Sequence, residues 1–178
     1  MATPDAGPAL QPSALSQAIK TSSLEKGSSP HSPHLHHLTA HIHHNLQYQH
    51  DWTALDIHTH SALAPSHALS RPLISGLPPQ RIYIHPDEQI ELLKKGDKEA
   101  QTAPEREWVL PTHVRETWTP HRLMDIFDAM TPEPPGDNSR SKSTWPRRRK
   151  RLLLATLNDD STVVYYILHE GIVKPRQN

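Results

Sequence analysis

At 178 residues the chain is long enough for one domain with disordered additions, and its formal net charge of +0 gives no whole-molecule attraction to nucleic acid. Hydrophobic residues make up 34% of it, which is too little to bury the whole chain, but they are grouped in blocks that allow a small core. With no cysteine, a disulfide framework and a thiolate metal site are excluded, and a reducing compartment fits. The start lacks a signal pattern and no run could span a membrane, so we expect a soluble, intracellular protein.

The first 33 residues are rich in alanine, proline, serine and glycine, and we expect residues 1–33 to be a disordered tail. A single domain is expected over residues 34–175. Its first element is a helix from Leu35 to Trp52, because apolar residues at steps of three and four form one stripe. The stripe consists of Leu35, Leu38, Ile42 and Leu46.

Histidines line another side of this helix beside Tyr48, at His34, His37, His41 and His44. Imidazoles four residues apart can share a metal ion. No carboxylate cluster or cysteine lies nearby in the sequence to complete a ligand set. We therefore favour a solvated helix face over a metal site, and we predict neither a metal nor another cofactor.

Extended segments follow this helix. Partial alternation of apolar and polar residues predicts a strand over 53–61. Pro78 and Pro79 then separate two extended segments, 72–77 and 81–85, and because proline cannot donate a ladder hydrogen bond it closes one and starts the other. We expect these two segments to form a hairpin-like pair.

Two further helices each begin with a proline, which fits the first helical position. Pro86, ahead of two acidic residues, begins a short helix that Gly96 ends. The clearer helix follows Thr119 and Pro120, because its apolar residues recur at helical spacing. These residues are Leu123, Ile126, Phe127 and Met130.

Polar stretches without apolar periodicity at 97–106 and 131–146 are predicted to be inserts or linkers. Between the first of them and the clear helix, residues 107–113 contain a strand that we expect to end at Pro111.

The C-terminal region contains two apolar stretches, 152–157 and 162–168, joined by a turn sequence that includes Asp159 and Asp160. This pattern predicts a β-hairpin. Both alternating sets of the second strand are apolar, which predicts that both of its faces are covered. Its outer edge should attract a partner strand unless something blocks it. The strand residues are Val163, Val164, Tyr165, Tyr166, Ile167 and Leu168.

A basic cluster precedes the hairpin and comprises Arg147, Arg148, Arg149, Lys150 and Arg151. It could contact RNA phosphates, act as a nuclear localisation signal or solvate the start of a strand, and charge pattern does not choose among these. No aromatic stacking surface accompanies it, so a free-standing RNA-binding module is not indicated. The sequence has no phosphate-binding loop, nucleophile elbow or zinc-protease motif, and motifs alone indicate no enzyme.

Helices scattered among strands, with a terminal hairpin, predict an α+β fold with a compact mixed or antiparallel sheet and flanking helices. The sequence from Lys150 to Tyr166 resembles the C-terminal end of tRNA-splicing endonuclease subunits. Blocks at 73–79, 83–89 and 108–111 resemble, in order, the small structural subunit of the fungal complex (the Sen fifteen family). The resemblance implies the C-terminal nuclease fold of these endonucleases.

This resemblance implies a place in a complex of four unlike subunits that excises introns from precursor tRNA, leaving a 2′,3′-cyclic phosphate. Catalytic members use a tyrosine, a histidine and a lysine. Lys150 lies near the place of the family lysine, but no tyrosine occurs between Tyr83 and Tyr165, and Tyr83 with His85 does not reproduce the family spacing. We therefore expect a structural subunit with no catalytic residue. The alternatives are an RNA-binding adaptor that uses residues 147–151 and, less favoured, an independent RNase.

The implied partners are two catalytic endonuclease subunits and one further structural subunit, with precursor tRNA reached through the complex. Strand 163–168 would meet a sister subunit, and Asp159 with Asp160 would insert into a basic pocket of another. Without the resemblance, an ordinary solvated turn is the favoured interpretation of that acidic pair. The free chain could homodimerise. We expect the nucleus, or alternatively the cytosolic face of mitochondria, and no membrane insertion.

Overall fold

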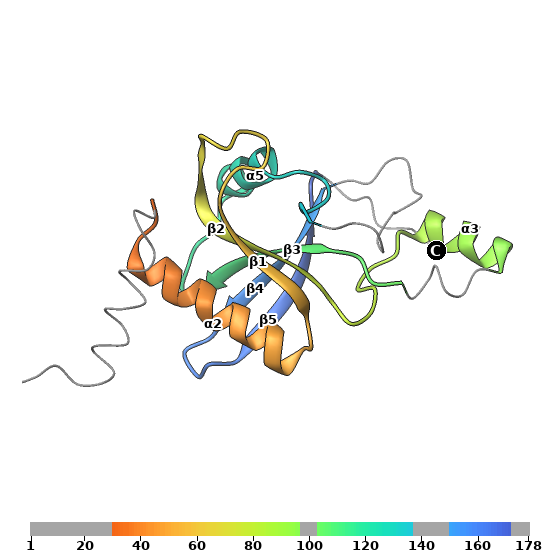
Figure 1. The fold of residues 1–178 in the computed structure, drawn as a ribbon, viewed down its shortest axis with the longest axis horizontal. Helices are drawn as coiled ribbons and strands as arrows, with labels where there is room; N and C mark the ends of the chain where they lie inside the picture. Colours follow the sequence, from red (N-terminus) through yellow and green to blue (C-terminus); the bar gives the residue numbers. More distant parts are fainter. Residues whose placement is uncertain (1–29, 97–102, 137–149, 172–178) are drawn as a thin grey trace, which may run out of the picture.

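The computed structural model describes residues 30–96, 103–136 and 150–171. Within them, three helices and five strands form an α+β domain, as predicted (Figure 1). The elements are α2 (Pro33–Gln49), β1 (Thr53–His60), β2 (Ala68–Leu77), α3 (Pro86–Lys95), β3 (Glu107–His113), α5 (Pro120–Ala129), β4 (Arg151–Leu157) and β5 (Val163–His169). The expected tail lies outside the described residues except for its last few positions. Most of both expected inserts also lie outside them.

The five strands form one open mixed sheet in the order β1-β2-β3-β4-β5. Neighbours are antiparallel except β3 and β4, which run parallel. The connection between these two parallel strands contains α5, as a crossover requires. β1 and β5 are the two edges of the sheet, and β5 is reached through the predicted terminal hairpin.

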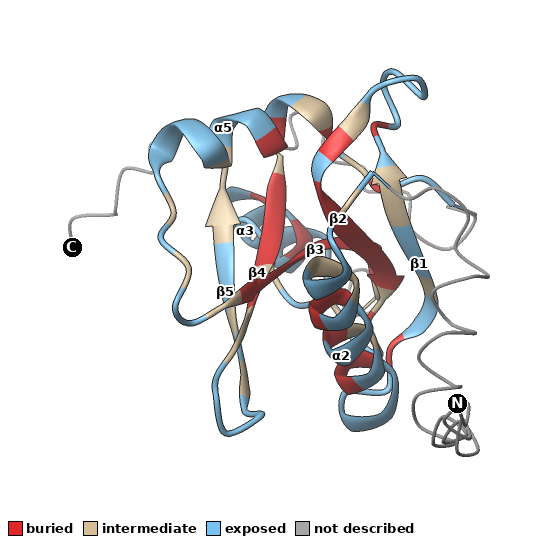
Figure 2. Ribbon diagram, turned by 90° about the vertical axis from the view of Figure 1, so that its left-hand side faces the viewer, coloured by how far each residue is buried: buried red, intermediate tan, exposed pale blue. Residues whose placement is uncertain are grey.

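Helices α2 and α5 pack on opposite faces of the sheet, and α2 crosses the middle strands in Figure 2. Successive strand residues point to opposite faces, so Ile74 and Val109 pack under α2 whereas Leu73 and Leu110 pack under α5. β3 is buried on both faces, which explains why its middle residues, 108–111, are all apolar. The α2 side of the core comprises Leu38, Ile42, Leu46, Trp52, Ile74, Val109, Leu153 and Ala155.

The helix ends agree with the sequence signals. The Thr119 side chain accepts a hydrogen bond from the Arg122 backbone N–H and caps α5. Gly96 has φ 70° and ends α3 in the left-handed conformation that glycine adopts without strain. No helix in the described ranges has both the length and the apolar character needed to cross a bilayer.

Two predictions about extended segments are wrong. Residues 81–85 form no strand and no hairpin with β2, because β1 and β3 already occupy both sides of β2. β3 also continues past Pro111 to His113. The β2–β3 ladder ends at the pair Ile74–Val109, and its register would place Leu73 opposite Leu110 and then Pro72 opposite Pro111. Neither proline has an N–H to donate, so pairing stops here while β3 continues against β4.

Candidate protein–protein interface

The outer strand β5 is a regular sheet edge that exposes apolar side chains. Seven consecutive residue pairs join it to β4 without a register shift, and in the described part of the chain no strand pairs with its other side. Val163 and Tyr165 pack on the α2 side of the core and Leu168 on the α5 side. The exposed fractions of the rest of the apolar set are 43% for Val164, 55% for Tyr166 and 38% for Ile167.

The predicted cover on both faces of β5 is therefore wrong for the isolated chain. α2 and α5 pack mainly over the inner strands, and only part of each β5 face lies beneath them. The predicted open outer edge, in contrast, is present.

The adjacent tyrosines of β5 have opposite environments. The Tyr165 hydroxyl donates to Asn45 Oδ1 on α2 at 2.5 Å, and its ring meets the His50 ring edge-on at 5.2 Å. Burial raises the pKa of Tyr165 well above its usual value. Tyr166 points to the other face of the sheet and is exposed. Tyr165 therefore joins β5 to α2, whereas Tyr166 can contact another molecule.

The hairpin turn presents Asp159 and Asp160 differently. Arg115 donates to Asp159 Oδ2 from Nη2 at 2.5 Å and from Nε at 3.1 Å, and His113 Nε2 lies 3.4 Å from Asp159 Oδ1. Asp160 is exposed and accepts the Thr162 backbone N–H at 2.9 Å, which lowers the pKa of its carboxyl. Sequence reasoning missed Arg115, because no local pattern links residues 44 positions apart.

Lys150 belongs to the basic cluster and lies near the position of the lysine that catalytic family members use. In this structure its side chain caps α5. Its Nζ donates to the Phe127 carbonyl at 2.7 Å, and Ser61 Oγ donates to the Ala129 carbonyl at 2.6 Å. The last carbonyls of a helix lack partners within it, so both bonds satisfy the end of α5. Residues 147–149 lie outside the described residues.

Arg151 lies within a buried ion-pair network. Its Nε donates to Glu107 at 3.0 Å and its Nη2 to Glu105 at 3.0 Å, with a second bond from Nη2 to Glu107. Arg81 continues the network to Glu105 at 3.1 Å and Glu88 at 2.6 Å. Burial alone would lower the pKa of Arg151, but the two carboxylates outweigh it and raise the pKa. In this arrangement the guanidinium is committed to carboxylates rather than exposed to phosphate.

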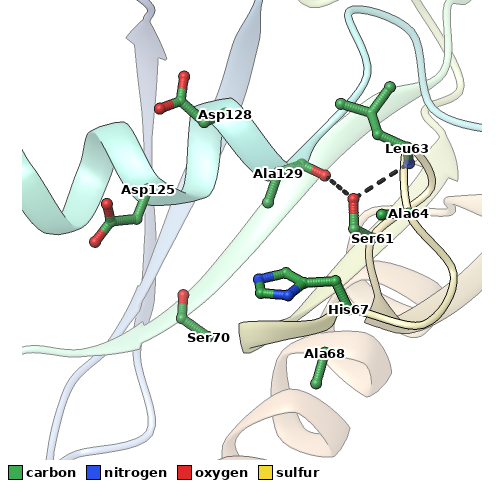
Figure 3. A pocket seen from close by; sticks show the side chains of 9 residues that line it. All are labelled: Ser61, Leu63, Ala64, His67, Ala68, Ser70, Asp125, Asp128 and Ala129. Carbon is green, nitrogen blue, oxygen red and sulfur yellow. Dashed lines mark hydrogen bonds between the residues drawn. The ribbon is translucent and has the colours of Figure 1, made fainter.

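A depression of about 530 Å³ lies between the β1–β2 connection and α5 (Figure 3). His67, Asp125 and Asp128 are its titratable groups. Figure 3 shows both carboxylates turned away from the imidazole, and Asp125 instead lies 3.3 Å from His121 Nδ1. His67 is therefore paired with neither carboxylate of the depression.

No group of three or more histidine, aspartate or glutamate side chains within residues 30–96, 103–136 and 150–171 is arranged to hold a metal ion. The histidines of α2 are largely exposed, and His44 packs against Tyr48 with ring centroids 4.5 Å apart.

The fold and its open edge define a small α+β domain with an apolar strand at one edge of its sheet. The chain belongs to the Sen15 protein family, whose model matches residues 41–178. It is 47% identical over 156 residues to the probable tRNA-splicing endonuclease subunit tsp-1 of Neurospora crassa, covering 82% of this chain and 67% of that protein.

Two further relatives are more distant. The tRNA-splicing endonuclease subunit SEN15 of Eremothecium gossypii is 26% identical over 79% of this chain and 91% of its own length. The probable subunit sen15 of Schizosaccharomyces pombe is 27% identical over 71% of this chain and 73% of its own length. The family resemblance of the sequence is thus confirmed.

Proposed function

We propose that this chain is a non-catalytic structural subunit of the tRNA-splicing endonuclease, which excises introns from precursor tRNA. It assembles with two catalytic subunits and one further structural subunit through β5 and the acidic hairpin turn. Family membership supports the complex, and the open apolar edge of β5 carries the assembly role.

A polypeptide that adds a strand to β5 would pair with the free backbone groups of that edge. It would also cover Val164, Tyr166 and Ile167, which are exposed in the isolated chain. Buried tyrosines are frequent centres of binding energy in interfaces. The free chain can meet the same need by pairing β5 with a second copy, which is the expected homodimer.

The acidic turn offers a second contact, to a basic surface on another subunit. Asp160 is the better placed carboxylate, because Asp159 is already paired with Arg115 inside the chain. Asp160→Lys should therefore weaken assembly about tenfold without changing the fold.

The environments of the lysine, tyrosine and arginine side chains that could act on RNA favour a non-catalytic role. Lys150 donates to the end of α5. Tyr165 donates to Asn45, and because burial raises its pKa it would be a poor general base. Of the basic cluster, Arg151 is buried among carboxylates, so an RNA-binding adaptor would depend on residues 147–150.

Assembly can be tested by co-expressing the chain with the other endonuclease subunits of the same fungus and assaying precursor-tRNA cleavage with and without it. We expect no cleavage by the chain alone, and co-purification that Val164→Glu with Tyr166→Glu abolishes. The control is Ile57→Glu, an exposed position on the opposite edge β1, which should co-purify normally. Cleavage by the isolated chain, or full assembly of the β5 variant, would contradict the proposal.

We further propose a nuclear location, for which the basic cluster is the candidate signal. Neutralising residues 147–150 in a fluorescent fusion should shift the protein to the cytoplasm. A signal on mitochondria in the unaltered fusion would favour the alternative.

A further inference from the structure

The exposed part of α2 is unusual for a solvated helix because it has no aspartate, glutamate, lysine or arginine. None of its 17 residues is Asp, Glu, Lys or Arg, and its exposed positions are filled mainly by histidine, glutamine and tyrosine. Solvated helix faces normally carry charged residues. Depletion of charge and enrichment of tyrosine are instead typical of the centre of a protein–protein interface.

One flank of α2 faces the outer strand of the sheet, and the contact between Asn45 and Tyr165 fixes this orientation. His41 lies four residues before Asn45 and Tyr48 three residues after it, so both share its side of the helix. Continuing at the same spacing, His44, His37 and His34 extend this flank. We call the set His34, His37, His41, His44 and Tyr48 the histidine flank; all five are exposed, Tyr48 by 65%.

The histidine flank is therefore on the side of α2 that is turned toward β5 and toward any strand added to it. In Figure 2, α2 lies in front of the middle strands, β5 lies beyond β4, and no helix lies in front of β5. An added strand would lie about 4.8 Å outside β5. Every second side chain of that strand would point to the face that α2 occupies, next to the histidine flank.

We propose that the histidine flank is the second half of the partner interface, and that it packs against the endonuclease subunit whose strand pairs with β5. This inference rests on the proposed function. It gives the histidine-rich helix a role in assembly. When the imidazoles are neutral, this chain contributes no charged side chain to the contact.

The test uses full-length chains that compete with tagged wild-type chain for the co-expressed endonuclease subunits. His41→Lys with His44→Lys introduces two charges that would be buried on assembly, and we expect its incorporation to fall at least about tenfold. His41→Gln with His44→Gln keeps the flank neutral and should stay within about threefold of wild type. Gln47→Lys adds a charge to an exposed position on the other side of α2 and should also stay within about threefold.

A second measurement uses the unaltered protein, so it does not depend on any variant folding. Diethylpyrocarbonate should modify the histidines of the flank in the free chain and fail to modify them in the assembled complex. His121, whose side chain is 80% exposed on α5, should react in both states.

Equal incorporation of the lysine pair, an equally severe effect of Gln47→Lys, or flank histidines that stay reactive in the complex would overturn this inference. None of these results affects the proposed function, which fails if the wild-type chain does not assemble, if the β5 variant assembles fully or if the isolated chain cleaves precursor tRNA.

Discussion

The two edges of the sheet, β1 and β5, are built in opposite ways. The β1–β2 ladder is irregular at two places, between Thr53 and Asp56 and between His58 and His60. Ala54 in β1 has φ 49°, a left-handed conformation that is strained for a residue with a side chain. β5 has an unbroken ladder with β4 and no positive φ.

The side chains of the two edges differ in the same sense. β1 is mainly polar, with Ile57 as its exposed large apolar side chain, and Arg106 reaches it to donate to the Ala54 carbonyl at 2.9 Å and to Asp56 at 2.7 Å. β5 exposes valine, tyrosine and isoleucine. Irregular pairing and charge protect an edge strand from other chains. β1 has both protections and β5 has neither, which supports the proposal that the partner binds at β5.

The largest expected effect on stability comes from the buried arginines that support the two edges. Arg151→Met removes an ion-pair partner from Glu107 and from Glu105, both of which are buried, and we expect it to lower the free energy of unfolding by about 3–5 kcal/mol. Arg106→Met, on the β1 side, leaves Asp56 largely exposed to water and should cost about 1–2 kcal/mol.

Urea denaturation of the two variants measures the difference. Equal losses would mean that the two edges do not differ in how deeply their charges are buried.

A smaller effect should separate the two tyrosines of β5. Tyr165→Phe removes the hydrogen bond to Asn45 and should cost about 1 kcal/mol, whereas Tyr166→Phe should leave stability unchanged. In the assembly competition, Tyr166→Phe should reduce incorporation more than Tyr165→Phe if the Tyr166 hydroxyl contacts the partner. Thermal denaturation gives the stability values, and a loss for Tyr166→Phe as large as that for Tyr165→Phe would contradict the assigned orientations.

The smallest effect concerns pH at the β1 edge. His58 hydrogen-bonds Ser75 Oγ at 2.8 Å and packs against Trp108. Burial lowers the pKa of His58 below the usual 6.5, with Arg106 acting in the same direction and Asp56 opposing it. Below pH 6.5 the unfolded chain binds a proton here that the folded chain resists, so stability falls as the pH drops.

His58→Gln should therefore lose less stability than wild type between pH 7.5 and 5.5, as measured by urea midpoints. If the urea midpoints of wild type and variant depend on pH in the same way, His58 does not contribute to the pH dependence of stability.

Apolar spacing made most of the fold predictable. The stripes of α2 and α5 and the terminal hairpin follow from residues that lie close together in the sequence, such as Ile126 and Met130. Spacing could not show that both sides of β2 are occupied, and so it failed for 81–85.

Polar contacts between distant segments were not predictable. The pairs Arg151–Glu107 and Arg115–Asp159 each join residues 44 positions apart, and charged residues carry no period that reveals their partners. The partial cover of β5 was missed for a related reason, since an apolar pattern does not say whether the same chain or another one provides the cover.

The most direct test of the account is amide hydrogen exchange of the chain, free and within the assembled endonuclease. The account predicts that exchange of β5 amides slows strongly on assembly, because a partner strand bonds the open edge, while exchange of β1 amides is unchanged. Equal exchange of β5 in the two states, or new protection of β1 instead, would contradict it.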